Sequence, residues 1–93
     1  IPIGENFIIS ANCGTFFYDG VRNFKKLSDK SVNSIRALQG EIKISLKDSG
    51  IYLYEDRILK QTEYSLNGLN CYFIDNRIVA ELHGNIYIID EDD

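Results

Sequence analysis

The sequence predicts a mainly β (α+β) fold: an antiparallel β-meander or curled partial barrel with one short helix near residues 29–39. Turn-forming dipeptides such as Asp19-Gly20 and Asp75-Asn76 punctuate the chain. From residue 48 onward they recur roughly every 7–12 residues, which is typical of short strands joined by hairpins. The runs between the turns are rich in Ile, Tyr, Phe and Leu, the residues that strands favour. The 93 residues leave room for a single domain, 1–93, which ends in an acidic tail at 90–93.

The turns divide the chain into expected strands near residues 7–11, 15–18, 21–25, 41–47, 51–54, 57–66, 69–74, 77–82 and 86–89. In the strand at 41–47, Ile42, Ile44 and Leu46 alternate with polar residues, which predicts a half-buried strand with a wet outer face. The strands near 51–54, 71–74 and 86–89 are apolar on both faces. We expect these strands to be covered on both sides, or to use one face for a partner.

One segment departs from the β pattern and predicts the short helix at 29–39. Ser28 is a suitable N-cap because its hydroxyl accepts a hydrogen bond from a free backbone N–H of the first turn. Leu27 and Val32 stand at the two positions of a hydrophobic staple. Gly40 suits the left-handed position that commonly ends a helix.

Three stretches share one pattern and form a weak internal repeat: GTFFYDGVR at 14–22, GIYLYEDRI at 50–58 and NCYFIDNRI at 70–78. Each consists of an expected strand, a turn with an acidic residue, and a return strand with an early Arg. The pattern has two interpretations, convergent hairpin chemistry or a duplicated hairpin unit.

The stretch from Ile42 to Asp90, with SGIYLYEDRILK and FIDNRIVAELHGNIYIID, resembles a blade of a WD-repeat-like β-propeller. The chain has no Trp, so the Trp-Asp pair of that family is missing. At about 40–45 residues per blade the whole chain has room for two blades, whereas a closed propeller needs at least four.

Charge and composition argue against several function classes. The net charge of −4 is accounted for by the four acidic residues at 90–93, so residues 1–89 are balanced. The one basic cluster, around Lys25 and Lys26, is too small for a nucleic-acid stripe, and no apolar run is long enough to span a membrane. No nucleotide-binding or metal-binding motif is present, so we expect no cofactor. The use of only two cysteines favours a reducing, cytoplasmic setting.

The sequence offers few catalytic candidates, and we expect no enzymatic activity. A nucleophile dyad would have to pair His83 with Cys13 or Cys71, but His83 lies in an expected exposed turn and no local nucleophile motif supports the dyad. The carboxyl groups of Glu55, Asp56 and Asp75 are expected at hairpin tips, where water keeps their pKa values ordinary.

The tyrosines are the best binding candidates, since Tyr52, Tyr54, Tyr72 and Tyr87 fall on neighbouring expected strands. Two-residue hairpin tips would pair Tyr54 with Arg57, Ile74 with Arg77, and Tyr72 with Val79. A face of Tyr, Arg and aliphatic side chains has the composition of a protein-binding hot spot. The alternative is that this face packs under the helix or the N-terminal hairpin. The predicted partner-binding set is Tyr52, Tyr54, Arg57, Tyr72, Arg77, Tyr87, Asp90, Glu91, Asp92 and Asp93.

These features favour a non-catalytic protein-binding module. The favoured version is a small inhibitor or immunity-type protein that masks a partner protein, for which the acidic tail suggests a basic partner. In the other it is a structural component of a larger assembly that contributes β-strands or a propeller-blade-like unit. A small enzyme that uses Cys and His is the remaining alternative.

Overall fold

The computed structural model describes residues 1–4 and 6–90, and antiparallel strands dominate this part of the chain. The strands are β1 (Pro2–Ile3), β2 (Asn6–Ala11), β3 (Gly14–Tyr18), β4 (Phe24–Ser28), β5 (Val32–Leu38), β6 (Glu41–Leu46), β7 (Gly50–Glu55), β8 (Ile58–Gln61), β9 (Leu69–Ile74), β10 (Arg77–Leu82) and β11 (Asn85–Asp90). The predicted mainly β, antiparallel architecture is confirmed. The described residues contain no helix, and therefore none that could cross a membrane.

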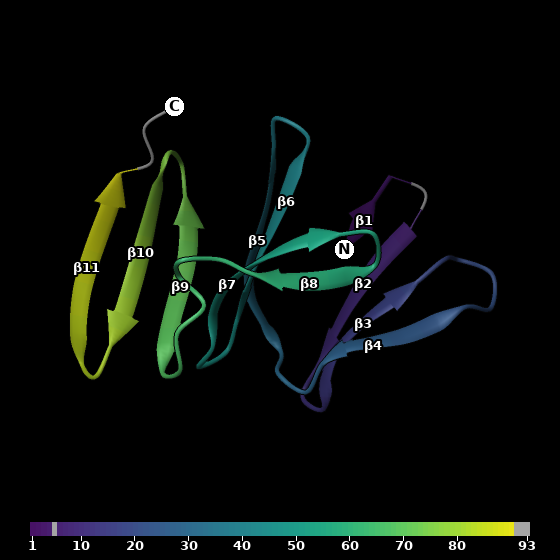
Figure 1. Cartoon of the computed structure of the whole chain (residues 1–93), viewed down its shortest axis with the longest axis horizontal. Helices are drawn as coiled ribbons and strands as arrows, with labels where there is room; N and C mark the ends of the chain where they lie inside the picture. Colours follow the sequence, from purple (N-terminus) through teal and green to yellow (C-terminus); the bar gives the residue numbers. More distant parts are fainter. Residues whose placement is uncertain (5, 91–93) are drawn as a thin grey trace.

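The strands form three sheets rather than a curled barrel (Figure 1). Sheet A has the order β1-β2-β3-β4, sheet B the order β5-β6-β7-β8, and sheet C the order β11-β10-β9. The sheets stand in a row with sheet B in the middle, and the molecule measures 41 × 29 × 18 Å. The stretch from Ile42 to Asp90, which resembles one propeller blade in sequence, contributes to two of these sheets, B and C.

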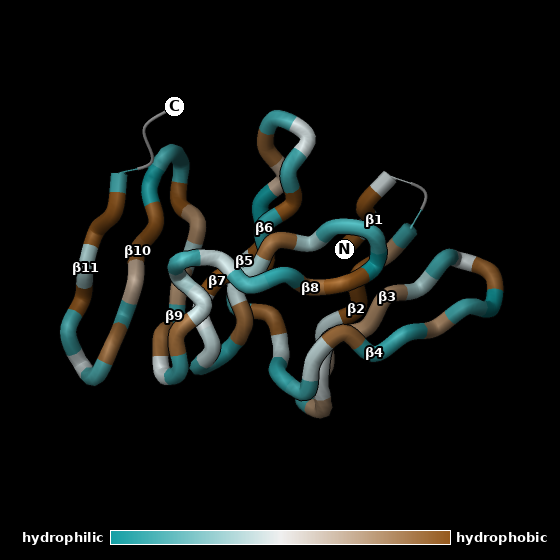
Figure 2. Tube along the Cα trace, viewed as in Figure 1, coloured by the Kyte–Doolittle hydropathy of each residue, from teal (hydrophilic) through white to brown (hydrophobic). Residues whose placement is uncertain are grey.

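Two hydrophobic clusters hold the row together, one on each side of sheet B. Between sheets A and B, Ile8, Ile44 and Leu46 are buried, and Leu27, Val32, Tyr52 and Tyr54 are among the side chains packed around them. Between sheets B and C, the buried residues are Ile51, Leu69, Cys71, Ile78 and Ala80. Sheet B is therefore covered on both faces, as the apolar strand at 51–54 predicts. Figure 2 shows the hydrophobic segments along these strands and also along β11 at the end of the row.

The predicted helix at 29–39 is wrong, because residues 32–38 form strand β5. A β-bulge lies between Val32 and Ser34, so the register to β6 shifts by one residue there. The shift puts Val32 and Ile35 on the face toward sheet A, while Ser34 and Arg36 face sheet C. The extra residue breaks the two-residue alternation that would have indicated a strand. The remaining spacing imitates a helix.

Hairpin turns connect most strands, although the turns expected at Asp19-Gly20 and at Glu55-Asp56 differ from prediction. Asp75-Asn76 is a two-residue loop, as expected. The expected tight turn at Asp19-Gly20 is a wider loop that extends to Asn23, because the Asp19 carboxylate accepts hydrogen bonds from three successive backbone N–H groups. The strand expected at 21–25 consequently begins only at Phe24.

The strand expected at 57–66 ends at Gln61, and the following segment folds back as a loop onto β7. The hydroxyls of Thr62 and Ser65 both donate to the Ile51 carbonyl, each at 2.7 Å. The Ile51 N–H in turn donates to the carbonyl of Tyr64 at 2.9 Å. These hydrogen bonds from the loop satisfy the backbone N–H and carbonyl of Ile51, where β7 lies beside sheet C.

Candidate protein-interaction surface

The predicted tyrosine face does not exist as one surface. Tyr52 and Tyr54 lie on β7 and face sheet A, where they pack around the cluster of Ile8, Ile44 and Leu46. Partial burial raises the pKa of the Tyr54 hydroxyl. This is the packing under the N-terminal hairpin that the sequence left open as an alternative. These two tyrosines therefore belong to the core between sheets A and B.

Arg57 is exposed, yet its side chain also contacts sheet A. It lies in the turn between β7 and β8 with φ of 63°, and Tyr54 pairs with Leu59, so the predicted Tyr54–Arg57 pairing is wrong. The Arg57 guanidinium stands over the ring of Phe17 on β3, 4.9 Å from its centroid. Such a cation–π contact is worth about 0.5–2 kcal/mol, depending on desolvation.

Of the other predicted residues, Tyr72, Arg77, Tyr87 and Asp90 lie on sheet C, mostly on its outer face, which points away from sheet B. The predicted pairs Ile74–Arg77 and Tyr72–Val79 are confirmed. Val79 in turn pairs with Ile88 on β11, so one row of apolar side chains crosses all three strands. Tyr87 pairs with Ala80 and lies on the opposite face, although it is half exposed.

The outer face of sheet C is unusually apolar for a surface. The exposed fractions are 43% for Tyr72, 53% for Ile74, 71% for Ile86 and 63% for Ile88. Each of these side chains is on the same face because antiparallel partners lie on one side of a sheet. A contiguous exposed apolar patch of this kind marks an interaction site more often than it marks ordinary surface.

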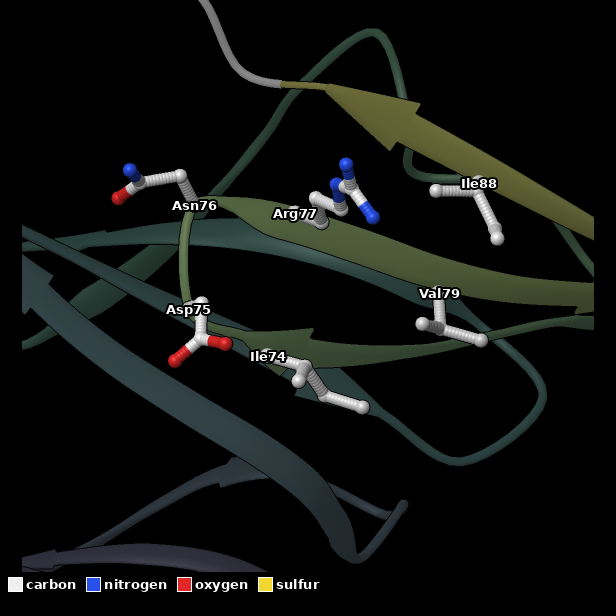
Figure 3. A pocket seen from close by; sticks show the side chains of 6 residues that line it. All are labelled: Ile74, Asp75, Asn76, Arg77, Val79 and Ile88. Carbon is white, nitrogen blue, oxygen red and sulfur yellow. The ribbon is translucent and has the colours of Figure 1, made fainter.

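A hollow of about 390 Å³ opens in this face (Figure 3). Ile74, Val79 and Ile88 line it from three neighbouring strands, and Asp75, Asn76 and Arg77 complete its lining. An ion pair lies at this end, because Arg77 Nε and Asp90 Oδ1 are 2.9 Å apart. Both side chains of the pair are more than 60% exposed, so the pair adds little stability. The other predicted tail residues, Glu91, Asp92 and Asp93, lie outside the described residues.

A second apolar face, which the sequence analysis did not identify, lies at the opposite end of the row on sheet A. Phe7, Tyr18 and Phe24 are in register across three strands and face away from sheet B. Their rings form a ladder, with centroids 6.2 Å apart for Phe7–Tyr18 and 5.1 Å for Tyr18–Phe24. Phe16 joins the ladder at 5.9 Å from Phe24, which is itself 60% exposed. The sequence signal for this face was the aromatic run Phe16-Phe17-Tyr18, because side chains alternate between the two faces of a strand and Phe16 and Tyr18 therefore share one face.

The three catalytic candidates from the sequence, His83, Cys13 and Cys71, lie in different surroundings. His83 is exposed in the turn between β10 and β11, as the sequence predicts. Cys13 is exposed in the turn between β2 and β3, whereas Cys71 is fully buried, and the two thiols are free. Burial raises the pKa of the Cys71 thiol to about 11, so it stays protonated and weakly nucleophilic at neutral pH. Within residues 1–4 and 6–90, no His, Cys, Asp and Glu side chains gather into a metal-binding group.

No protein-family model, curated protein sequence or solved structure matches this chain. The interaction surface therefore stands on the geometry alone.

Proposed function

We propose that this protein is a non-catalytic protein-binding module that serves as a structural component of a larger assembly. The observation that carries the proposal is the outer face of sheet C, where Tyr72, Ile74 and Ile88 are exposed by 43%, 53% and 63% on the two strands that flank β10. Burying such side chains against a partner is favourable by about 25 cal/mol per Å² of apolar surface. A surface that is apolar in its centre and polar at its rim has the anatomy of a protein interface.

The inhibitor version would depend on negative charge around the tail, and the described residues give it less support. Asp90 is already paired with Arg77. The hollow beside this pair is lined mainly by aliphatic side chains, which suits an apolar partner surface better than a basic one. We therefore favour an assembly component that packs sheet against sheet.

Capture of partners by the tagged chain from lysate of its source, at low and high salt, tests this proposal. We expect wild-type protein and the control variant Val21→Lys to recover the same stoichiometric partner at both salt concentrations, and Ile88→Lys to lose it. Val21 is a matched control for sheet C because it is 77% exposed in the loop between β3 and β4, at the sheet A end of the row. Recovery of one basic enzyme that high salt releases, from Ile88→Lys as well as from wild type, would favour the inhibitor instead.

A further inference from the structure

The contact between sheets A and B is built around a pair of hydroxyls. Ser10 and Thr15 lie opposite each other on β2 and β3. The Ser10 hydroxyl accepts a hydrogen bond from the Val32 N–H at 2.9 Å, and the Thr15 hydroxyl donates to the Lys30 carbonyl at 2.7 Å. Sheet A thus binds the backbone edge of the first strand of sheet B.

The contact between sheets B and C repeats this arrangement. Ser34 and Ser45 lie opposite each other on β5 and β6. The Ser34 hydroxyl accepts from the Phe73 N–H at 3.0 Å, and the Ser45 hydroxyl donates to the Cys71 carbonyl at 2.7 Å. In both contacts the N–H belongs to the residue two positions after the carbonyl. The hydroxyl pair of each sheet therefore binds the backbone at the first strand of the next sheet in the same orientation. The row of sheets accordingly has a direction, from sheet A to sheet C, which we call its polarity.

Each sheet accordingly has two unlike faces, which we name by this polarity. The rear face points toward the sheet earlier in the chain, and the forward face toward the later one. The covered rear faces are apolar, as shown on sheet B by Val32, Ile35, Ile42, Ile44, Tyr52 and Tyr54, and on sheet C by Leu69, Cys71, Phe73, Ile78 and Ala80. The covered forward faces mix polar groups with apolar ones, such as Ser34, Arg36 and Ser45 beside Ile51 on sheet B.

The two uncovered faces at the ends of the row are one of each kind. The open face of sheet A is a rear face, on which the aromatic ladder of Phe7, Phe16, Tyr18 and Phe24 lies beside Ile9 and Lys26. The open face of sheet C is a forward face, in which Arg77 and Asp90 accompany Ile74 and the other apolar residues. The chain thus carries, at its two ends, the two kinds of face that pack together inside it.

We propose that a second copy of this chain docks the open face of its sheet A onto the open face of sheet C, so that the row continues from one molecule into the next. This inference rests on the proposed function and names the partner. The hollow between Ile74, Val79 and Ile88 is the place for an aromatic ring such as Phe24. Sheet C has no hydroxyl pair on this face, so the contact depends on apolar packing and on Arg77.

Each internal contact places an arginine over an aromatic ring, and between sheets B and C the arginine belongs to the forward face and the ring to the rear face. Arg57 stands over the ring of Phe17 between sheets A and B, and Arg36 stands 4.8 Å from the ring centroid of Phe73 between sheets B and C. Arg77 lines the hollow on the open face and is in position to stack on an incoming ring in the same way. Such a head-to-tail contact is heterologous, so it forms a ring if the rotation closes and an open row if it does not.

Sedimentation velocity and light scattering of the full chain across a range of concentrations test this inference. We expect wild type and the control variant Leu38→Lys, whose position is 52% exposed at the end of β5 in the central sheet B, to assemble beyond the dimer as concentration rises. Ile88→Lys, which blocks sheet C, and Phe24→Lys, which blocks sheet A, should each remain monomeric alone. Mixed in equal amounts they should form a one-to-one complex and nothing larger, because only one competent face remains on each. Circular dichroism checks the fold, and Ile86→Lys and Phe24→Ser replace either variant that does not fold.

Three results would overturn the inference. Wild type that stays monomeric at the highest attainable concentration has no self-docking face. Self-association of Phe24→Lys alone would mean a symmetric contact between two C sheets, and assembly that survives both blocks would place the contact elsewhere. A monomeric wild type that still captures a partner through Ile88 would refute the second copy but leave the proposed function standing, whereas loss of capture as well would refute both.

Discussion

Removal of the Ser45 hydroxyl should destabilise the fold far more than removal of the Ser10 hydroxyl. The two serines belong to equivalent pairs, but Ser45 is fully buried and Ser10 is exposed. In Ser45→Ala the buried Cys71 carbonyl loses a 2.7 Å donor that water cannot replace. Leaving a buried acceptor without its partner costs about 1–3 kcal/mol. In Ser10→Ala, water can replace the lost acceptor, so we expect less than about 0.5–1 kcal/mol.

Thermal unfolding followed by circular dichroism measures both costs at a protein concentration where the chain is monomeric. For a domain of this size, about 2 kcal/mol corresponds to a fall in Tm of roughly 8–16 °C. Ser34→Ala provides a further comparison, since it removes the acceptor of the Phe73 N–H from the same contact. If Ser45→Ala lowers Tm no more than Ser10→Ala does, the hydroxyl pairs do not hold the sheets together and the polarity of the row loses its physical basis.

Three further results are expected. Gly50→Ala should unfold the chain or cost at least about 3 kcal/mol, because Gly50 has φ of 83° and a Cβ there would lie 1.9 Å from the Tyr64 carbonyl oxygen; urea denaturation measures the cost. Backbone N–H donors lower the pKa of Asp19 to about 2, so its contribution to stability is present above its ordinary pKa of 3.8 and is lost as the pH falls toward 2; NMR titration should give this pKa, and Asp19→Asn should unfold less steeply in acid. Iodoacetamide should alkylate Cys13 within minutes but Cys71 only on unfolding, which mass spectrometry of quenched samples would show; rapid labelling of native Cys71 would contradict its burial.

The C-terminal hairpins could be predicted residue by residue, because local chemistry sets their register. The loop Asp75-Asn76 spans two residues, and once its length is known the pairs Ile74–Arg77 and Tyr72–Val79 follow. Tyr72 and Arg77 lie on the open face of sheet C, as a binding role for them requires.

The errors arise where contacts distant in sequence decide the local structure. The bulge in β5 follows from packing on two sheets at once, and no local signal distinguishes its spacing from that of a helix. Arg57 occupies a left-handed turn position that Asp-Gly or Asn-Gly would suit better, and its guanidinium lies over Phe17, about 40 residues earlier in the chain. The tyrosines were assigned to one face because the sequence does not show that β7 and β9 belong to different sheets.

The polarity of the row also decides how two copies can meet. If two C sheets met face to face, each forward face would bring its own Arg77 and Asp90 against those of the other, and Tyr72 would be the aromatic ring that each offered in place of the ladder on sheet A. Two A sheets meeting would join aromatic faces that contain no arginine. Only the head-to-tail contact places Arg77 opposite the ladder of Phe7, Tyr18 and Phe24, as Arg36 on the forward face of sheet B is placed opposite Phe73 inside the chain. Self-association through unlike faces is therefore the arrangement that continues the chemistry of the internal contacts.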